Sequence, residues 1–254
     1  MTTVCDMELV YTPVIAIAKA LFALEGLKFT MKGTENVPVE GGAVMAINHV
    51  GYMDFTYAGL AALPAGRLVR FMAKEEVFRH PVSGPLMRGM HHIPVDRAAG
   101  AASYRAAVNA LKAGEIVGVF PEATISRSFE LKEFKNGAVR MAATAGVPIL
   151  PVIVWGSQRV WTKDHAKRLG RSKVPIIVSI GEPMVFTRKD NLDQATIDVK
   201  FRMNDLLSDA QREYPVMTGN DLVFQPARLG GTAPTPAEAA ALDEAEALAR
   251  ATRT

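Results

Sequence analysis

A histidine and an aspartate stand close together just after the first apolar strand expected in the chain. His49 directly follows residues 43–47 and Asn48 in the run INHVGYMD, and Asp54 comes five residues later. Near neutral pH an imidazole can take a proton from a hydroxyl, and a carboxylate on its second nitrogen fixes the tautomer. Gly51 allows a tight turn that would bring Asp54 back to His49. The spacing predicts a general base with its orienting partner; the alternative is a helix N-terminus where both groups only bond to the backbone.

Three other short blocks accompany strand candidates in the same way. The run FPEAT, residues 120–124, ends a second apolar strand, and the run GMHHIPVDR, residues 89–97, places Arg97 after a third. The run VPILPV, residues 147–152, opens a fourth strand. Polar side chains at the ends of parallel strands meet at one edge of a sheet. We therefore expect Glu122 and Arg97 to converge on the cleft of the His–Asp pair.

These blocks resemble the PlsC-like glycerolipid acyltransferase family, whose best-known members acylate lysophosphatidate. The family's first block, NHxxxxD, matches NHVGYMD, which begins at Asn48. Its second block, a glycine and an apolar strand that ends in arginine, matches the segment from Gly89 to Arg97. Its third, FPEGTRS, appears here as FPEATIS, and its fourth, VPIxPV, as VPILPV. The similarity covers about residues 27–183, in the family's order and spacing.

The resemblance implies acyl transfer from a thioester, on CoA or acyl carrier protein, to a hydroxyl of a glycerol phosphate lipid. The acceptor hydroxyl would attack the thioester directly, with neither a cofactor nor a metal ion. Carried over by position, His49 is the general base and Asp54 orients it. Glu122 and Arg97 position the acceptor, and Lys74 helps to hold its phosphate. The supporting residues of the blocks are Asn48, Gly89, Pro121, Thr124 and Pro148.

The third block departs from the family pattern at two positions. Ile125 stands where the family usually has an arginine that contacts phosphate, and Ala123 stands where it has a glycine. Arg127, two positions later, is a candidate substitute for that arginine. Otherwise the phosphate would rest on three other cations: Arg97, Arg88 and Lys74. We favour 1-acylglycerol 3-phosphate as the acceptor, which would give phosphatidate in phospholipid biosynthesis; glycerol 3-phosphate, or another lysophospholipid or glycolipid, is the alternative.

The elements that must position these residues alternate along the chain. Apolar runs that predict buried strands occur at residues 43–47, 68–73, 92–95, 116–120, 149–155 and 176–180. Helical stretches separate or follow them, among them residues 55–63, 103–113, 138–145 and 193–214. Runs that are apolar throughout and alternate with helices are typical of a sheet covered on both faces. We therefore predict an α/β fold, with a mostly buried sheet and helices on both faces.

An apolar segment, residues 9–24, precedes these elements and is interrupted by Lys19. It falls short of the ~20 apolar residues that span a bilayer, so it is either buried against the domain or lies in the membrane interface. We expect three parts: an N-terminal helical membrane-association segment at residues 1–28, the acyltransferase domain at 29–225, and a linker with a short tail helix at 226–254. The run TPAE predicts a capping box at the start of the tail helix.

The chain of 254 residues carries a formal net charge of +3. Residues 231–254 contribute a net −2, so the remainder carries +5. This mild positive charge suits an anionic small substrate or a membrane surface rather than nucleic acid. The basic residues of the stretch 155–173 are interleaved with Trp155 and Trp161. A basic loop with tryptophan favours an anionic lipid interface, or it could attract the phosphates of CoA; the alternative is a solvated basic loop. We expect a peripheral protein on the cytoplasmic face of the membrane, with no nucleic-acid partner.

Several other functions lack the residues they need. Cys5 is the single cysteine, so no intrachain disulfide can form and a reducing compartment is expected. The sequence has no HxxxH or CxxC spacing, which argues against a metal site, and neither a GxGxxG fingerprint nor a P-loop, which argues against hydride transfer and nucleotide hydrolysis. A lipid- or acyl-carrier-binding protein without catalysis is the alternative from another class, and the presence of both His49 and Asp54 argues against it.

Overall fold

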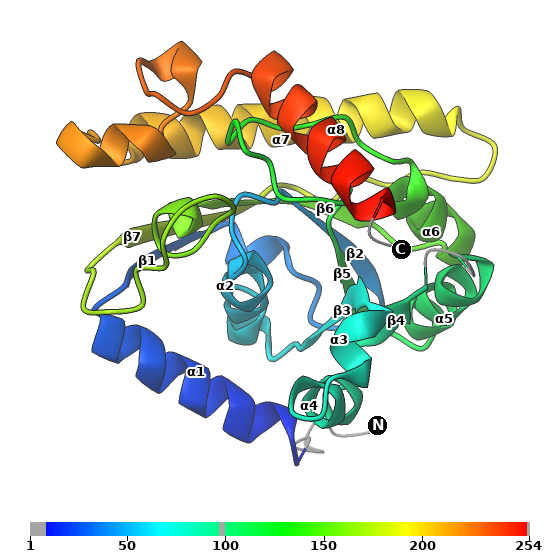
Figure 1. Cartoon of the computed structure of the whole chain (residues 1–254). Helices are drawn as coiled ribbons and strands as arrows, with labels where there is room; N and C mark the ends of the chain where they lie inside the picture. Colours follow the sequence, from blue (N-terminus) through cyan, green and yellow to red (C-terminus); the bar gives the residue numbers. More distant parts are fainter. Residues whose placement is uncertain (1–8, 97–99, 253–254) are drawn as a thin grey trace.

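The computed structural model describes residues 9–96 and 100–252, which form a seven-stranded sheet with helices on both faces (Figure 1). The strands are β1 (Lys28–Lys32), β2 (Ala43–Ile47), β3 (Val69–Lys74), β4 (Ile93–Val95), β5 (Ile116–Val119), β6 (Ile149–Trp155) and β7 (Pro175–Ile180). Their order across the sheet is β1-β7-β6-β2-β5-β3-β4. β6 and β7 are antiparallel, and the other neighbours are parallel. The predicted α/β fold is confirmed.

Two groups of helices cover the sheet. The helices are α1 (Tyr11–Glu25), α2 (Asp54–Leu60), α3 (Glu75–Arg79), α4 (Ser83–Gly89), α5 (Gly100–Lys112), α6 (Gly137–Ala145), α7 (Leu192–Glu213) and α8 (Pro236–Ala251), with short 3-10 turns η1 (Thr34–Asn36), η2 (Leu63–Ala65), η3 (Ser157–Arg159), η4 (Gly219–Phe224) and η5 (Ala227–Leu229). One hydrophobic core joins α5, α6 and α7 to one face of the sheet, and a second joins α1 and α2 to the other face (Figure 1).

The central strands are apolar at every position because both of their faces are covered. Every residue of β2 and of β6 is buried. β1 differs: its residues alternate between exposed and half-buried at the edge of the sheet, where it pairs with β7. β1 is not predicted from the sequence, because the run KFTMK is short and carries lysine at both ends.

α1 has one buried side and one exposed side. Tyr11 and Phe22 are buried, and the Phe22 ring packs edge-on against Tyr57 of α2 with centroids 5.1 Å apart. Exposed apolar side chains of α1 are Ile17, Leu21 and Leu24. The segment therefore packs on the domain and also presents apolar surface to its surroundings. Within the described part of the chain, no helix is long and apolar enough to cross a bilayer.

α8 begins with the capping box expected from the run TPAE. Glu238 Oε2 accepts the Thr235 backbone N–H at 2.8 Å, and the Glu238 N–H donates to Thr235 Oγ1 at 3.3 Å. These reciprocal bonds satisfy backbone donors that a helix start leaves unpaired. From this start α8 runs on the same side of the sheet as α7 (Figure 1).

Candidate active site

Three of the predicted site residues lie at one edge of the sheet, where parallel strands end. His49 follows β2, Glu122 follows β5, and Lys74 is the last residue of β3. These strands are parallel neighbours, so their carboxyl ends meet at the same edge. β6 is parallel to β2 and ends there too, and Ser157 follows it. The edge therefore gathers side chains from four strands.

His49 and Asp54 form a bonded pair. His49 Nδ1 lies 3.0 Å from Asp54 Oδ2, and the imidazole stacks on the Phe120 ring with centroids 4.2 Å apart. Asp54 Oδ2 also accepts the backbone N–H groups of Val50 and Gly51, each at 2.8 Å. Asp54 is fully buried, whereas His49 is partly exposed. The imidazole is thus held with Nδ1 toward the carboxylate and Nε2 on the opposite side of the ring, which is the arrangement that a general base needs.

Ser157 completes the contacts of Asp54, and it is not among the site residues predicted from the sequence. Its hydroxyl donates to Asp54 Oδ1, and the residue is fully buried. Gly51 permits this contact, because a Cβ at that position would lie 2.8 Å from Ser157 Oγ. Gly51 is therefore needed for close approach of two chain segments. A signal for Ser157 existed, since it follows the end of β6 much as His49 follows the end of β2.

Asn48 ties two strand ends together. Its side-chain amide donates to the Val154 carbonyl at 3.1 Å and accepts the Val154 N–H at 2.7 Å. Asn48 is buried, so these bonds fix β2 against β6 at the point where His49 leaves the sheet. At the other end of the same strand pair, the Pro148 carbonyl accepts the Val44 N–H at 2.9 Å. Asn48 and Pro148 therefore both help to hold β2 against β6.

Glu122 bonds to backbone with both of its carboxyl oxygens. Oε1 accepts the His49 N–H at 2.8 Å, and Oε2 accepts the Lys132 N–H at 3.0 Å. Burial raises the pKa of Glu122 to about 7, although the two N–H bonds act to lower it. Glu122 thus joins the His49 turn to the loop that follows β5, and its carboxyl group titrates near neutral pH.

The two departures of the third block are visible in the loop after β5. Ile125 is buried, with only 3% of its surface exposed, so it does not present a side chain to solvent. Ala123 has a φ of +61°, in the left-handed region that favours glycine, the residue the family usually has here. Thr124 Oγ1 accepts a hydrogen bond from Lys132 Nζ at 2.6 Å, and Pro121 is buried. The loop keeps the family's backbone turn at Ala123 without its arginine.

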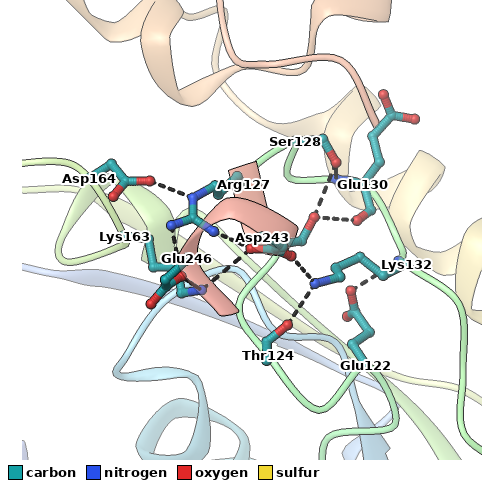
Figure 2. Close-up of polar contacts among 11 residues, drawn as sticks. Glu122, Thr124, Arg127, Ser128, Glu130, Lys132, Lys163, Asp164, Asp243 and Glu246 are labelled. Atoms are coloured by element: carbon teal, nitrogen blue, oxygen red, sulfur yellow. Dashed lines mark hydrogen bonds and ion pairs between the residues drawn. The ribbon is translucent and has the colours of Figure 1, made fainter. Parts of the chain in front are cut away.

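Arg127, the candidate substitute for that arginine, is covered by the C-terminal helix. Its guanidinium contacts the carboxylates of Asp164, Asp243 and Glu246, as Figure 2 shows. Asp243 and Glu246 both belong to α8. Lys132 also contacts Asp243. The structure therefore places Arg127 in an ion-pair cluster between the β5 loop and α8.

The second block is only partly described. Arg97 lies outside the described residues. Lys74 is exposed at the end of β3, next to β4, the strand that leads to Arg97. Gly89 ends α4 and lets the chain before α1 approach, because a Cβ there would lie 2.7 Å from the Val10 side chain. Arg88 donates to a backbone carbonyl of α3 at 2.7 Å.

The two tryptophans of the basic stretch lie in different environments. Trp155 is buried at the end of β6, with its ring edge-on to Tyr214, so its predicted place in a lipid interface is wrong. Trp161 is half-buried and packs against Tyr52 with ring centroids 4.8 Å apart. Lys167 Nζ lies 4.0 Å from the centre of the Trp161 ring. Only Trp161 therefore remains near the surface.

Three of the six basic residues between β6 and β7 contact carboxylates. Arg159 and Arg168 contact the two carboxylate oxygens of Asp221, at 2.5 and 2.6 Å, and Lys163 contacts Glu246 at 3.0 Å. These pairs take up positive charge that the sequence alone assigns to lipid or to phosphate. In residues 9–96 and 100–252, no group of three or more His, Cys, Asp and Glu side chains is placed to hold a metal ion.

Known proteins resemble this chain in sequence and in fold. The acyltransferase family model matches residues 28–155. The chain is 33% identical over 170 residues to the 1-acyl-sn-glycerol-3-phosphate acyltransferase of Bacillus subtilis (strain 168), a match covering 66% of this chain and 80% of that protein. The protein of the same name from Borreliella burgdorferi is 28% identical over 157 residues, covering 59% and 60%. The crystal structure of the 1-acyl-sn-glycerophosphate (LPA) acyltransferase PlsC from Thermotoga maritima matches with a TM-score of 0.66 at 22% identity, covering 81% of each chain.

Proposed function

Because the chain belongs to the acyltransferase family, we propose that it transfers a fatty acyl group from a thioester to the free hydroxyl of 1-acylglycerol 3-phosphate. The observation that carries the proposal is the His49–Asp54 pair at the carboxyl ends of parallel strands. Relatives named as 1-acyl-sn-glycerol-3-phosphate acyltransferases support this acceptor. CoA or acyl carrier protein would carry the acyl group, and the product would be phosphatidate.

The pair supplies general-base catalysis. Asp54 accepts a hydrogen bond from the Nδ1–H of His49, so the neutral imidazole keeps its lone pair on Nε2. Nε2 takes the proton of the acceptor hydroxyl while the hydroxyl oxygen attacks the thioester carbonyl carbon. When the tetrahedral intermediate collapses, the C–S bond breaks and the imidazolium returns the proton to the leaving thiolate. Asp54 stabilises the imidazolium between these two transfers.

The acceptor's phosphate needs cationic donors near this pair. We assign that role to Arg97 and Lys74, because β3 and β4 are parallel neighbours, Lys74 is the last residue of β3, and Arg97 comes two residues after β4 in the sequence. A guanidinium binds a phosphate group through two parallel hydrogen bonds, which an ammonium group cannot form. Arg97→Ala is therefore expected to raise the KM for the phosphorylated acceptor at least ~10-fold and to leave the donor KM unchanged.

An acceptor panel tests the proposed reaction. The purified chain receives one acyl-CoA with, in turn, 1-acylglycerol 3-phosphate, glycerol 3-phosphate, a lysophospholipid with a substituted phosphate, and an unphosphorylated monoacylglycerol. Thiol release is recorded and the products are identified by mass spectrometry. Phosphatidate as the main product supports the proposal, and faster acylation of another acceptor favours the alternative that Ile125 leaves open. Thiol release that no acceptor stimulates contradicts acyl transfer. Repeating the panel with acyl carrier protein identifies the donor.

We also propose that α1 attaches the protein to a membrane surface. Ile17, Leu21 and Leu24 are exposed apolar side chains on one helix, a pattern that suits the interface between water and acyl chains. Leu21→Asp with Leu24→Asp should reduce sedimentation with anionic liposomes, because it would place charge among acyl chains. Val216→Asp, at an exposed apolar position outside α1, is the matched control and should leave sedimentation unchanged. Equal sedimentation of all three proteins would contradict a role for α1.

A further inference from the structure

Three cations from two loops converge on a single carboxylate of the C-terminal helix. Arg127 and Lys163 contact Asp243 Oδ1, Lys163 at 3.5 Å, and Lys132 contacts Asp243 Oδ2 (Figure 2). Glu246, one helical turn later, accepts from Arg127 Nη2 at 2.9 Å and from Lys163 Nζ at 3.0 Å. Two acids of α8 thus occupy the centre of a cluster that the catalytic domain builds.

The cluster requires an anion at this position. The side chains of Arg127 and Lys163 are only 9% and 14% exposed, so water screens their mutual repulsion poorly. Burial acts to lower the pKa of Arg127, but the carboxylates of Asp164 and Glu246 outweigh it and raise the pKa. If α8 moved away, another anion would have to replace its two carboxylates or the cations would have to separate.

α8 is held to the domain chiefly by these charges. Among its described side chains, Ala239 is the one that is buried, whereas Leu242 and Leu248 are 46% and 70% exposed. Apolar burial contributes about 25 cal/mol per Å², and a single alanine offers little area. Elements with few buried apolar contacts are the first to open locally. Releasing α8 therefore costs the domain little beyond the ion pairs with Asp243 and Glu246.

The cluster is connected directly to the candidate active site. The backbone N–H of Lys132 donates to Glu122 Oε2 at 3.0 Å, and Glu122 Oε1 accepts the His49 N–H at 2.8 Å. The Lys132 ammonium group donates to Thr124, within the third block, at 2.6 Å. A ligand held by this cluster would therefore lie beside the loop that fixes His49.

We infer that Arg127, Lys132 and Lys163 form a binding site for a phosphate monoester, and that Asp243 and Glu246 close this site until the ligand displaces α8. A phosphate monoester carries about −1.5 to −2 charges at neutral pH and three acceptor oxygens, which matches the two carboxylates it would replace. The inference rests on the proposed function, because two substrates of that reaction carry such a group. One is the nucleotide part of acyl-CoA; the other is the acceptor lipid, whose phosphate would then rest on this cluster rather than on Arg97 and Lys74.

Hydrogen exchange of the α8 amides in the full-length chain tests ligand-driven release. Exchange is measured first without ligand. It is then measured with two matched pairs of ligands: 1-acylglycerol 3-phosphate and monoacylglycerol, and acyl-CoA and acyl-dephospho-CoA. We expect one phosphate monoester to speed exchange in residues 236–251 and its dephosphorylated counterpart to have no effect. The pair that shows this difference identifies the source of the phosphate. Unchanged or slower exchange with both phosphate monoesters would overturn the inference.

Charge removal on α8 tests closure by a second route. Asp243→Asn with Glu246→Gln should lower one KM at least about 5-fold: that of the substrate whose phosphate monoester speeds exchange in α8. The reason is that this ligand no longer competes with two carboxylates. Glu244→Gln, at an exposed position on the same helix, removes the same kind of charge outside the cluster and should leave KM unchanged. An unchanged or higher KM in the folded double variant would overturn the inference.

The exchange experiment needs no turnover, so the two proposals can fail separately. Release of α8 by a phosphate monoester without acylation of any lysophospholipid would refute the proposed function and leave the phosphate site in place. Acylation of 1-acylglycerol 3-phosphate without any response of α8 would refute the phosphate site and leave the reaction in place.

Discussion

Ser157→Ala removes one donor from a carboxylate that has no contact with water. Asp54 is fully buried, and its Oδ1 accepts the Ser157 hydroxyl while Oδ2 serves His49 and two backbone N–H groups. A hydrogen bond to a charged group contributes about 1.5–3 kcal/mol to stability. For a chain of this size each kcal/mol shifts the melting temperature by about 2–4 °C. We therefore expect the variant to melt about 3–12 °C below the parent protein.

The same change should also slow catalysis. Asp54 loses the bond that fixes its second oxygen, so the imidazole it orients is held less firmly. We expect kcat to fall about 10- to 100-fold, the size of effect that small misplacements of reacting groups produce. KM for both substrates should change little, because Ser157 is buried and bonds to Asp54 rather than to a ligand.

Thermal unfolding and steady-state kinetics check both effects. Ser172→Ala is the matched control, because the Ser172 hydroxyl is buried and bonds to none of the described groups. It should retain the parent's melting temperature and kcat. If Ser157→Ala were as stable and as active as Ser172→Ala, the bond to Asp54 would have no role and the reasoning would be refuted.

Three further changes test other parts of the site. The pKa of Glu122 is raised to about 7 from an ordinary 4.5, so between these values the folded protein keeps a proton that the unfolded chain releases. The free energy of unfolding should therefore fall between pH 5 and pH 8 by about 2–3 kcal/mol more in the parent than in Glu122→Gln, as denaturant unfolding would measure. A parallel pH dependence of the two proteins would contradict this. Asn48→Ala leaves the buried N–H and C=O of Val154 unpaired and should cost about 2–5 kcal/mol of unfolding free energy; a loss below 1 kcal/mol would argue against the clamp. Gly89→Ala should destabilise the protein by about 1–3 kcal/mol through its contact with Val10, and Val10→Ala should rescue it in the double variant but would not if the cost arose elsewhere.

The features that the sequence predicts well have local causes. The strands at residues 43–47 and 149–155 are apolar throughout because both faces of the sheet are covered. Their own residues therefore predict that they are buried strands. His49 and Asp54 lie within one turn of chain, so their contact follows from spacing and from the small residue between them. The four blocks also follow one another in the family's order.

The features that the sequence does not predict depend on distant segments. Ser157 contacts Asp54 across 103 positions, and Arg127 contacts Asp243 across 116. A charge pattern shows that acids and bases are present, but it does not say which of them meet. The basic neighbours of Trp155 predict a lipid interface, yet the residue is buried and its ring packs against Tyr214. In these cases tertiary packing determines which residues contact each other, and the sequence pattern does not show those contacts.

The role assigned to His49 is measured by the turnover of His49→Ala with acyl-CoA and 1-acylglycerol 3-phosphate at neutral pH. His49 is partly exposed, and in His49→Ala the Asp54 carboxylate keeps its bonds to Val50, Gly51 and Ser157, so the protein should still fold, with at most a lowered melting temperature; circular dichroism and thermal unfolding check this. The rate of phosphatidate formation should fall ~10²–10⁴-fold, the contribution of a general base. Near-normal turnover by a folded His49→Ala protein would contradict the mechanism.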